Sequence, residues 1–370
     1  MNEIRNTLLA LNASGNLRAI PDDTSQLSDI TDFSSNVYHG LGANTAMRDD
    51  FLRECAAESV PLTSSASRLL SARQSEYLHL EKILEDAYQR PALLFNSGYH
   101  ANTGLISALG GKDTLFVADK LVHASIVDGL VLSKSQFVRF RHNDMDHARR
   151  LIEKNAAQYK RLVIIAESVY SMDGDTAPID ELIRLKSLHP DSLLYIDEAH
   201  AIGVRGPAGL GEALHFGDSV DIIVGTFGKA IASEGAFAAL NDDLRRFMVN
   251  RCRSLIFSTA ISPLMVRWTA RMLSTAMGMD TERVHLKKIA HILYSKARTS
   301  VDSHIQPFII GNASRAVQIS RQLMADRMKV LPIRTPTVPP GSERLRISLS
   351  AAMTVSDVQR LADALNLITI

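Results

Sequence analysis

Five short, largely apolar runs between residues 92 and 224 constrain the fold more than any other feature of the sequence. They occupy residues 92–95, 114–117, 162–165, 193–196 and 221–224. None of them alternates between polar and apolar side chains, which is typical of strands covered on both faces of a sheet. The stretches between them leave room for crossover helices. The sequence therefore predicts an α/β fold with a mostly parallel central sheet.

The regions before and after these runs carry different patterns. Residues 75–90 place apolar side chains at helical spacing between charged ones, which predicts an amphipathic helix. Residues 344–350 alternate strictly, which predicts a half-exposed antiparallel strand with Arg344 and Arg346 on its polar face. Residues 354–357 resemble a capping box that begins a helix. We predict three parts, namely an N-terminal segment over residues 1–45, a large α/β domain over residues 46–265 and an α+β domain over residues 266–370.

Charge and cysteine content exclude several classes of protein. Lys and Arg together number 41 and Asp and Glu number 40, so the molecule has no overall field that would attract nucleic acid or an acidic membrane. No apolar run approaches the roughly 18 residues of a membrane span, and the N-terminus lacks the pattern of a signal peptide. The two cysteines, Cys55 and Cys252, are too few for a disulfide framework. We expect a soluble cytoplasmic protein with reduced thiols and neither a nucleic-acid nor a membrane partner.

Polar side chains follow four of the predicted strands at the point where each strand ends. In chain order they are Ser97, Gly98 and Tyr99, then Glu167 and Ser171, then Asp197 and His200, and finally Lys229. The carboxyl ends of parallel strands meet at one edge of a sheet, which is where open α/β sheets place their ligand sites. We therefore expect these groups to gather at one edge.

An aspartate and a lysine at one edge of the sheet match two needs of pyridoxal phosphate. A buried aspartate such as Asp197 keeps the pyridine nitrogen protonated, and a partly desolvated lysine such as Lys229 forms an imine with the aldehyde. His200 is spaced to hydrogen-bond the phenolic oxygen of the ring. The turn at residues 97–99 leads into a predicted helix, whose first backbone N–H groups suit a phosphate. The joint arrangement, rather than any single residue, predicts a site for this cofactor.

Each residue taken alone has a simpler interpretation. Asp197 and His200 could form a metal pair, or a helix N-cap beside a buried imidazole. A lone lysine after a glycine, such as Lys229, is usually a solvated surface group. His123 by itself is more often a core histidine than one that stacks on a cofactor, and the turn at residues 97–98 is a weak signal. Only the arrangement of these groups in space distinguishes the interpretations.

The motifs around these residues resemble the α-oxoamine synthase family of fold-type-I pyridoxal-phosphate enzymes. The resemblance is most specific at residues 197–204 and 226–229, which contain Asp197 and Lys229. It continues in the same order at residues 34–38, 95–102, 167–175 and 257–259. It thus covers nearly the whole chain. The resemblance implies a large domain with a mostly parallel central sheet and a smaller α+β C-terminal domain.

Carried over residue by residue, the resemblance implies four catalytic residues in this chain. Lys229 would hold the cofactor as a Schiff base, and Asp197 would pair with the pyridine nitrogen. His123 would stack on the ring. His200, together with Ser171, would contact the phenolic oxygen. No metal is implied.

The resemblance also implies how the cofactor phosphate is held. Ser97 belongs to the implied cofactor-binding turn, and the backbone amides of Gly98 and Tyr99 would meet the phosphate with the Thr226 side chain. Thr259 would reach the phosphate from a second subunit. This last role implies a homodimer whose active sites are shared between the subunits.

The implied reaction is a decarboxylative Claisen condensation between an amino acid and an acyl thioester. Arg346 would hold the amino-acid carboxylate, with Asn36 as a second substrate-binding residue. Residues 333–341 most resemble the branch of the family that joins L-alanine to pimeloyl-CoA, or to its carrier-protein form, in biotin biosynthesis. Residues 305–311 fit the same branch. The expected protein is therefore a pyridoxal-phosphate-dependent acyltransferase.

Other functions remain as alternatives. The nearest is a sister enzyme of the same family that uses glycine with acetyl-CoA or succinyl-CoA, or a long-chain acyl group. A pyridoxal-phosphate lyase or desulfurase would share the lysine and the aspartate but not the order of the motifs. A binding or regulatory protein without cofactor would have no need for the intact set of Lys229, Asp197, His123 and His200.

The sequence departs from the family pattern at several positions. Serines and alanines fill much of residues 63–72, where the family usually has a glycine-rich stretch. Each added Cβ narrows the conformations of that loop. Val37 and His39 replace the usual Asp and Leu, and Met353 stands where the family commonly has His. These departures bear on the acyl substrate more than on the cofactor.

Overall fold

The computed structural model describes residues 2–18, 20, 29–72 and 74–368, which divide into two compact units. The large unit comprises His39–Tyr170 and Thr176–Arg283. The small unit comprises the described parts of Met1–Tyr38, Ser171–Asp175 and Val284–Ile370. The divisions predicted from the sequence, after residues 45 and 265, differ from these because the small unit draws on separate stretches of the chain. Residues 1, 19 and 21–28 of the predicted N-terminal segment lie outside the described residues.

The large unit is built on a mostly parallel sheet. Its strands are β2 (Ala92–Phe95), β3 (Thr114–Asp119), β4 (Gln136–Phe140), β5 (Arg161–Glu167), β6 (Ser192–Asp197), β7 (Ile222–Thr226) and β8 (Ala236–Leu240). In the described chain their order is β2-β8-β7-β6-β5-β3-β4. β8 is antiparallel to both of its neighbours, whereas the other pairings are parallel. The five predicted strands are confirmed, and β4 and β8 were not predicted.

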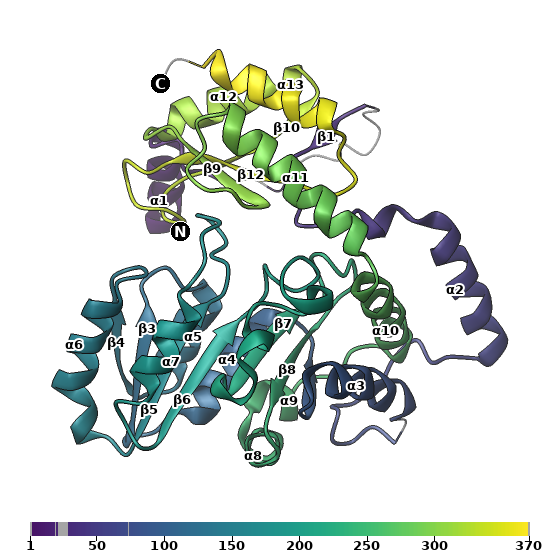
Figure 1. Ribbon diagram of the computed structural model, residues 1–370, viewed down its shortest axis with the longest axis vertical. Helices are drawn as coiled ribbons and strands as arrows, with labels where there is room; N and C mark the ends of the chain where they lie inside the picture. Colours follow the sequence, from purple (N-terminus) through teal and green to yellow (C-terminus); the bar gives the residue numbers. More distant parts are fainter. Residues whose placement is uncertain (1, 19, 21–28, 73, 369–370) are drawn as a thin grey trace. The chain divides into compact units, whose positions relative to one another are not determined.

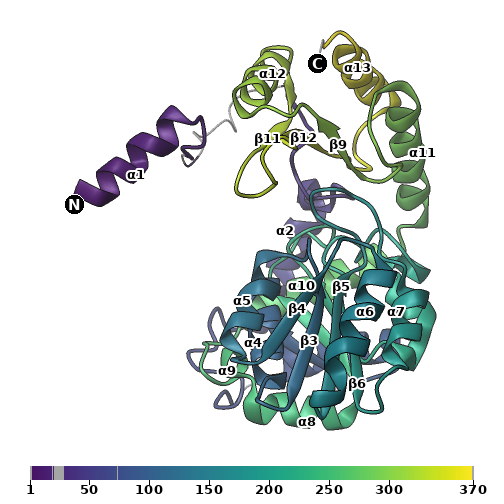
Figure 2. The same cartoon turned by 90° about the vertical axis from the view of Figure 1, so that its left-hand side faces the viewer.

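The large unit contains α2 (Thr45–Glu58), which lies apart from the sheet (Figure 1), and further helices that cover both faces of the sheet. The covering helices are α3 (Ser75–Tyr88), α4 (Gly98–Leu109), α5 (Ala124–Leu132), α6 (Met145–Asn155), α7 (Ile179–Lys186), α8 (Asp242–Arg251), α9 (Arg253–Ile256) and α10 (Pro263–Met277). Alternate residues of β3 point to opposite faces. Leu115 packs in a cluster with side chains of α3, α6, α7 and α10, whereas Phe116 packs with side chains of α4, α5, α8 and α9. Figures 1 and 2 show these helices on either side of the strands, and the helix predicted over residues 75–90 is confirmed as α3.

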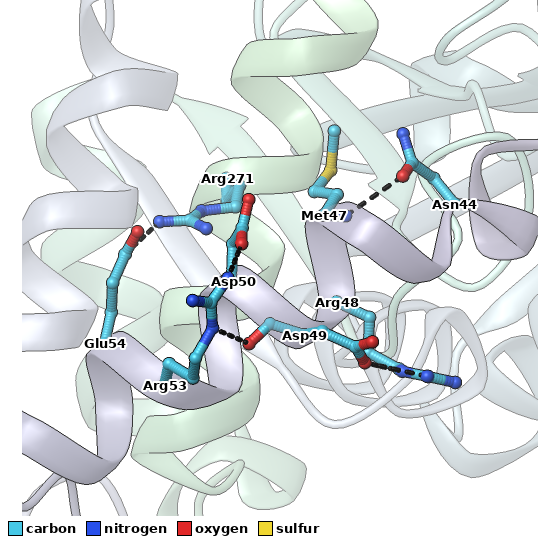
Figure 3. A network of polar contacts seen from close by, with 8 residues as sticks. All are labelled: Asn44, Met47, Arg48, Asp49, Asp50, Arg53, Glu54 and Arg271. Atoms are coloured by element: carbon cyan, nitrogen blue, oxygen red, sulfur yellow. Dashed lines mark hydrogen bonds and ion pairs between the residues drawn. The ribbon is translucent and has the colours of Figure 1, made fainter.

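Surface charges and one ring contact connect α2 to α10. The ring centroids of Phe51 and Trp268 lie 4.9 Å apart. Figure 3 shows the polar side of this contact, where Glu54 pairs with Arg271 and the Asn44 side chain caps α2 by accepting from the Met47 backbone N–H. Exposed ion pairs of this kind contribute less than about 1 kcal/mol each, so we attribute the attachment mainly to the rings.

The small unit contains an antiparallel sheet with helices packed against it. Its elements are α1 (Asn2–Ala13), β1 (Thr31–Asp32), most of α11 (Asp280–Lys296), β9 (Ile305–Ile309), α12 (Ala313–Ala325), β10 (Met328–Lys329), β11 (Leu331–Ile333), β12 (Arg344–Ser348) and α13 (Val355–Asn366). β12 lies between β11 and β9 and is antiparallel to both. β1 pairs in parallel with β10, where Thr31 is opposite Met328. The predicted capping box is confirmed, since the Thr354 and Asp357 side chains each bond the other's backbone N–H.

The prediction that β12 is half-exposed was wrong, because both of its faces are buried. Arg344 and Arg346 are each 5% exposed. The segment Ser171–Asp175 lies over the polar face and satisfies these charges, since Arg344 forms an ion pair with Asp173 at 2.6 Å. Strict alternation therefore marks a strand with one apolar and one polar interior face, rather than one face in water.

Several simple properties can be stated for the described residues. Cys55 and Cys252 are free and buried. Among the helices of the described chain, none combines the length and apolar character needed to cross a bilayer. Within the same residues, no group of three His, Cys, Asp or Glu side chains is arranged to hold a metal ion.

Candidate active site

The carboxyl ends of the parallel strands bring a lysine and a histidine into contact. Lys229 follows β7 and His200 follows β6, and the Lys229 Nζ atom lies 2.9 Å from the His200 Nε2 atom. His200 is 5% exposed and Lys229 is partly buried. The interpretation of Lys229 as a solvated surface group is therefore wrong. An amine held against an imidazole at a sheet edge is a group that can carry a proton.

Asp197 ends β6 beside a second buried carboxyl group. Asp197 is 4% exposed and is paired in register with Glu167 of β5, which is 2% exposed. Burial, and then repulsion by Asp197, raise the pKa of Glu167 well above its ordinary value. Two neighbouring carboxyl groups in such surroundings do not both ionise readily, so Glu167 holds its proton more tightly than a free glutamate does.

The segment after Asp197 is a turn and not a helix. The Asp197 Oδ1 atom accepts a hydrogen bond from the Ala199 backbone N–H at 2.9 Å, as in an Asx turn. The helix N-cap interpretation of Asp197 is therefore wrong. The turn leaves the Asp197 Oδ2 atom to accept from the Asn102 side chain at 2.7 Å.

A helix N-terminus and a threonine meet at the same edge of the sheet. Ser97 caps α4, accepting from the His100 backbone N–H at 3.2 Å, so Gly98 and Tyr99 occupy the first turn. A Cβ atom on Gly98 would come within 2.6 Å of the Thr226 Cγ2 atom. Glycine is thus required for this approach, which brings the first turn of the helix against the Thr226 side chain. Such an arrangement suits a phosphate.

His123 lies at the N-cap of α5, after β3. Its Nδ1 atom accepts from the Ser125 backbone N–H at 3.2 Å and lies 2.7 Å from the Ser125 Oγ atom. Its own backbone N–H donates to Glu167. The ring reaches solvent, yet its partial burial lowers the pKa of His123 below the ordinary value. His123 is thus an exposed, oriented imidazole and not a core histidine.

The serine- and alanine-rich loop at residues 63–72 supports Thr259. Ser67 and Thr259 form an antiparallel bridge, and the Ala260 backbone N–H donates to the Ala66 carbonyl at 2.9 Å. The Asn96 side chain donates to the Thr259 carbonyl at 2.8 Å. The Thr259 side chain itself is exposed. The sequence did not predict this pairing between the loop and residue 259.

The remaining predicted site residues belong to the small unit. The Arg346 Nε atom donates to the Ser171 carbonyl at 2.5 Å, and its Nη1 atom donates to the Ser348 Oγ atom at 2.6 Å. The Tyr38 hydroxyl donates to the Asn36 Oδ1 atom at 3.0 Å. Burial raises the pKa of Tyr38 to about 12, although the positive charge of Arg346 lowers the pKa of the same group. Within this unit, Arg346 and Asn36 are thus connected through the neutral Tyr38.

Sequence reasoning missed Asn102 and Tyr195, which contact this group of residues from inside the core. Asn102 is 2% exposed on α4, and Tyr195 is fully buried on β6. Tyr195 had a signal in the sequence, because it is two residues before Asp197 and so shares its face of the strand. Asn102 had none, because its neighbours in α4 include His100 and Thr103.

Glu198 follows Asp197 but contacts different partners. It is fully buried, and it accepts hydrogen bonds from the Ser168 side chain and from the Ala213 backbone N–H at 2.5 Å each. Burial raises the pKa of Glu198 to about 7. In the folded protein Glu198 is therefore protonated below pH 7, whereas in the unfolded chain it ionises above about pH 4.5.

This difference predicts a pH-dependent contribution to stability. A raised pKa stabilises the folded state fully below the unfolded value, and the stability is lost as the pH rises toward the folded value. We expect Glu198→Gln, which mimics the neutral acid, to gain about 2–3 kcal/mol relative to the native protein between pH 5 and pH 8, at about 1.4 kcal/mol per pKa unit. Urea unfolding at pH 5 and at pH 8 measures the gap, which is the free energy of unfolding of the variant minus that of the native protein. A gap that stays constant, or that changes in favour of the native protein, contradicts the prediction.

The residues of the large unit fit pyridoxal phosphate. The Lys229 amine suits an aldehyde, the buried Asp197 carboxyl group suits a pyridinium nitrogen, and the approach of the α4 N-terminus to Thr226 suits a phosphate. The closeness of Gly98 to Thr226 supports this fit most directly, because a side chain at residue 98 would collide with the Thr226 methyl group at the helix N-terminus. Each chemical group of the cofactor therefore has a matching protein group.

Comparisons with known proteins agree with this fit. The family described as "Aminotransferase class I and II" matches residues 28–365. A protein of Haemophilus influenzae named "Putative 8-amino-7-oxononanoate synthase" is 41% identical, and the match covers 98% of this chain and 99% of that protein. A Pasteurella multocida protein of the same name is 44% identical, over 88% of this chain and 87% of its own.

Solved structures show the same relationship. Serine palmitoyltransferase of S. paucimobilis, bound to a PLP–myriocin aldimine, superposes with a TM-score of 0.89 at 25% identity, over 98% of this chain and 96% of its own. An 8-amino-7-oxononanoate synthase of Francisella tularensis, at 23% identity and a TM-score of 0.76, covers 91% of this chain and 96% of its own and supports the fold. This chain therefore belongs to the class I and II aminotransferase family, as a pyridoxal-phosphate-dependent transferase of fold type I among the α-oxoamine synthases.

Proposed function

We propose that this enzyme condenses L-alanine with a pimeloyl thioester, giving 8-amino-7-oxononanoate, carbon dioxide and the free thiol, in biotin biosynthesis. The observation that carries the proposal is the 41% identity over 98% of the chain to a relative named for this product. The contact between Lys229 and His200 supplies the chemistry that such a condensation needs. The free, buried cysteines are consistent with a cytoplasmic site of action.

We assign the cofactor-binding roles as follows. Pyridoxal phosphate, when bound, supplies an aldehyde that takes up the substrate amine and a protonated ring that stabilises negative charge on the substrate Cα atom. Asp197 holds the proton on the ring nitrogen, and His123 stacks on the ring. His200 and Ser171 contact the phenolic oxygen. The phosphate is held by the residues of the α4 N-terminus and by two threonines, namely Ser97, Gly98, Tyr99, Thr226 and Thr259.

Thr259 is proposed to act on the phosphate of the second subunit in a homodimer. Its exposed side chain and its fixed backbone support this role, because both are needed by a residue that reaches a neighbouring subunit.

Lys229 moves the protons of the reaction. It takes the proton from the Cα atom of the bound amino acid. The electron pair left on Cα forms a carbon–carbon bond with the thioester carbonyl carbon, and the carbon–sulfur bond breaks to release the thiolate, which takes a proton from solvent to give the free thiol. The bond from Cα to the carboxylate then breaks to release carbon dioxide, and Lys229 returns a proton to Cα. Arg346 holds the carboxylate until it leaves, with Asn36 beside the bound amino acid.

A second candidate is a sister reaction with serine and a long-chain acyl thioester. The TM-score of 0.89 to serine palmitoyltransferase favours it, although the identity is only 25%. The two reactions share the cofactor chemistry and differ in both substrates.

Release of free thiol from a matrix of substrates separates these candidates. Purified enzyme is assayed with alanine, glycine and serine, each against pimeloyl-CoA, acetyl-CoA, succinyl-CoA and palmitoyl-CoA. We expect kcat/KM to be highest for alanine with the pimeloyl thioester, and pimeloyl carrier protein is then compared with pimeloyl-CoA. Faster reaction of glycine with a short acyl group, or of serine with palmitoyl-CoA, overturns the proposal in favour of the sister reaction.

Arg346→Lys is expected to weaken amino-acid binding selectively. Arg346 is fixed by Ser171 and Ser348, so its planar guanidinium group is held for a two-point contact with a carboxylate, which lysine cannot make. We expect KM for alanine to rise by about 10- to 100-fold, the loss of one charge-assisted contact, with a smaller change in KM for the thioester. Steady-state kinetics with each substrate varied in turn measure the difference.

Arg344→Lys is the matched control. Arg344 is buried on the same face of the same strand, but its partner is Asp173. It is expected to affect stability and to leave KM for alanine within a factor of about three. Equal increases in KM for alanine in both variants contradict a specific role for Arg346.

A further inference from the structure

A buried chain of hydrogen bonds joins two proposed cofactor-binding residues through groups that contact no substrate. The Tyr195 hydroxyl donates to the Asn102 Oδ1 atom at 2.6 Å. The Asn102 Nδ2 atom donates both to the Asp197 Oδ2 atom at 2.7 Å and to the Ser125 Oγ atom at 2.9 Å. The Ser125 Oγ atom lies 2.7 Å from the His123 Nδ1 atom. Asn102, Ser125 and Tyr195 are at most 2% exposed, so water does not replace these bonds.

The chemistry of each group fixes the direction of every bond. Burial, and then the nearby Asp197, raise the pKa of Tyr195 well above its ordinary value, so its hydroxyl keeps its proton and donates. That bond makes Oδ1 the acceptor side of the Asn102 amide, which leaves both Nδ2 protons for Asp197 and Ser125. The His123 Nδ1 atom already accepts from the Ser125 backbone N–H at 3.2 Å, so the Ser125 hydroxyl donates its proton to the same nitrogen.

At the end of the chain, the Nδ1 atom of His123 accepts two hydrogen bonds. One comes from the Ser125 hydroxyl and the other from the Ser125 backbone N–H at 3.2 Å. A nitrogen that accepts cannot carry a proton. In the neutral ring the proton is therefore on Nε2.

We propose that Tyr195, Asn102 and Ser125 are positioning residues that hold the Asp197 carboxylate and keep His123 as the neutral Nε2–H tautomer. This inference rests on the proposed role of His123 and Asp197 at the cofactor. The Asn102 amide thus serves two functions. One of its protons is donated to Asp197, and the other is donated to the Ser125 hydroxyl group, which orients the His123 ring. Because the Nδ1 lone pair is occupied by the two Ser125 donors and Nε2 carries a proton, the His123 ring does not compete with Lys229 for the substrate proton.

We call the hydrogen-bonded chain of Tyr195, Asn102 and Ser125 the relay. The protonation of His123 in the assembled enzyme reports whether the relay acts on the ring. Other charged or titratable groups face the ring, namely Asp197, Lys229, Asp128 and Glu167, so the comparison is made between variants that leave all four in place. Holoenzyme containing ¹⁵N-labelled histidine is titrated by NMR, and the His123 signals are identified by their loss in His123→Gln. We expect the native ring to be protonated on Nε2 alone at pH 8.

Ser125→Ala and Tyr195→Phe test the two ends of the relay. Donation to Nδ1 opposes its protonation, so removing the Ser125 hydroxyl makes the ring more basic. We expect the midpoint of His123 protonation to rise by about 0.7 pH unit in Ser125→Ala, which corresponds to the fivefold effect of one net hydrogen bond. Tyr195→Phe is also expected to raise the midpoint of His123 protonation. Tyr88→Phe is the control, because it removes a buried hydroxyl group that donates to the Leu210 carbonyl at 2.7 Å outside the relay.

Asn102→Leu distinguishes the branch of the relay that leads to Asp197 from the branch that leads through Ser125 to His123. We expect this variant to shift the His123 midpoint and also to weaken cofactor binding about tenfold through Asp197, measured from the visible absorption of the bound cofactor. Ser125→Ala is expected to shift the midpoint alone. A native ring protonated on Nδ1, or a midpoint in Ser125→Ala and Tyr195→Phe equal to that of Tyr88→Phe, overturns the proposal. No acyl thioester enters the titration, so this outcome is independent of the substrate assignment.

Discussion

We expect Lys229→Ala to reduce turnover by about 10³- to 10⁴-fold, the size of effect that general acid–base catalysis commonly contributes. Its Nζ atom lies against His200 at the carboxyl end of β7, whereas Lys120, which follows β3 at this edge, is exposed. The variant keeps the groups proposed to hold the cofactor phosphate and ring. Thiol release measures turnover, and the visible absorption of the purified protein reports the bound cofactor.

Lys186→Ala is the matched control for loss of a lysine. Lys186 pairs with Asp221 at 2.6 Å, next to the opposite end of β7. It is expected to retain turnover within a factor of about three. Turnover in Lys229→Ala that remains near the native rate would exclude Lys229 as the residue that moves the proton.

Asp197→Asn is expected to lower kcat by about 10²- to 10³-fold, comparable to the loss of one preorganised electrostatic contact in an active site. The substitution keeps the shape of the side chain and removes its charge. The new amide also places an N–H group against the Asn102 Nδ2 atom, which now donates to Asp197 at 2.7 Å. Both changes weaken the hold on the ring nitrogen. KM for the thioester is expected to change little, because Asp197 is not assigned a thioester contact.

Asp221→Asn provides the comparison for Asp197→Asn. Asp221 accepts from the Leu194 backbone N–H at 2.6 Å and pairs with Lys186, so it is a structural carboxylate next to the far end of β7. We expect it to lower stability without a selective loss of kcat. Equal losses of kcat in the two variants, measured with cofactor in excess, would contradict the electrostatic role of Asp197.

The apolar runs made the central sheet predictable, but not every strand. Strands buried on both faces are read directly from continuous apolar residues. β8 escaped prediction because three of its five residues are alanine, which has a low preference for strands. β4 mixes exposed Gln136 and Arg139 with apolar residues, as expected of a strand at the end of the sheet order. The antiparallel direction of β8 depends on its neighbours, which the local sequence does not contain.

The candidate site was predictable to the extent that its residues follow strands. Lys229, Asp197 and His200 were predicted to gather at one edge, and the structure places Lys229 against His200. Asn102 was not predicted because its contacts depend on how α4 packs on the sheet, over a separation of 95 residues from Asp197. The buried polar face of β12 was missed for the same reason, since Arg344 meets Asp173 from a distant part of the chain.

The pairing of β1 with β10 has a consequence for the synthesis of this protein. Thr31 leaves the ribosome long before its partner Met328. The strands of the large unit all lie between them, so that unit can fold earlier, as domains generally do during translation. The small unit cannot complete its fold until Met328 has been translated. A nascent chain that stalls before Met328 would therefore present a folded large unit joined to an unpaired N-terminal strand.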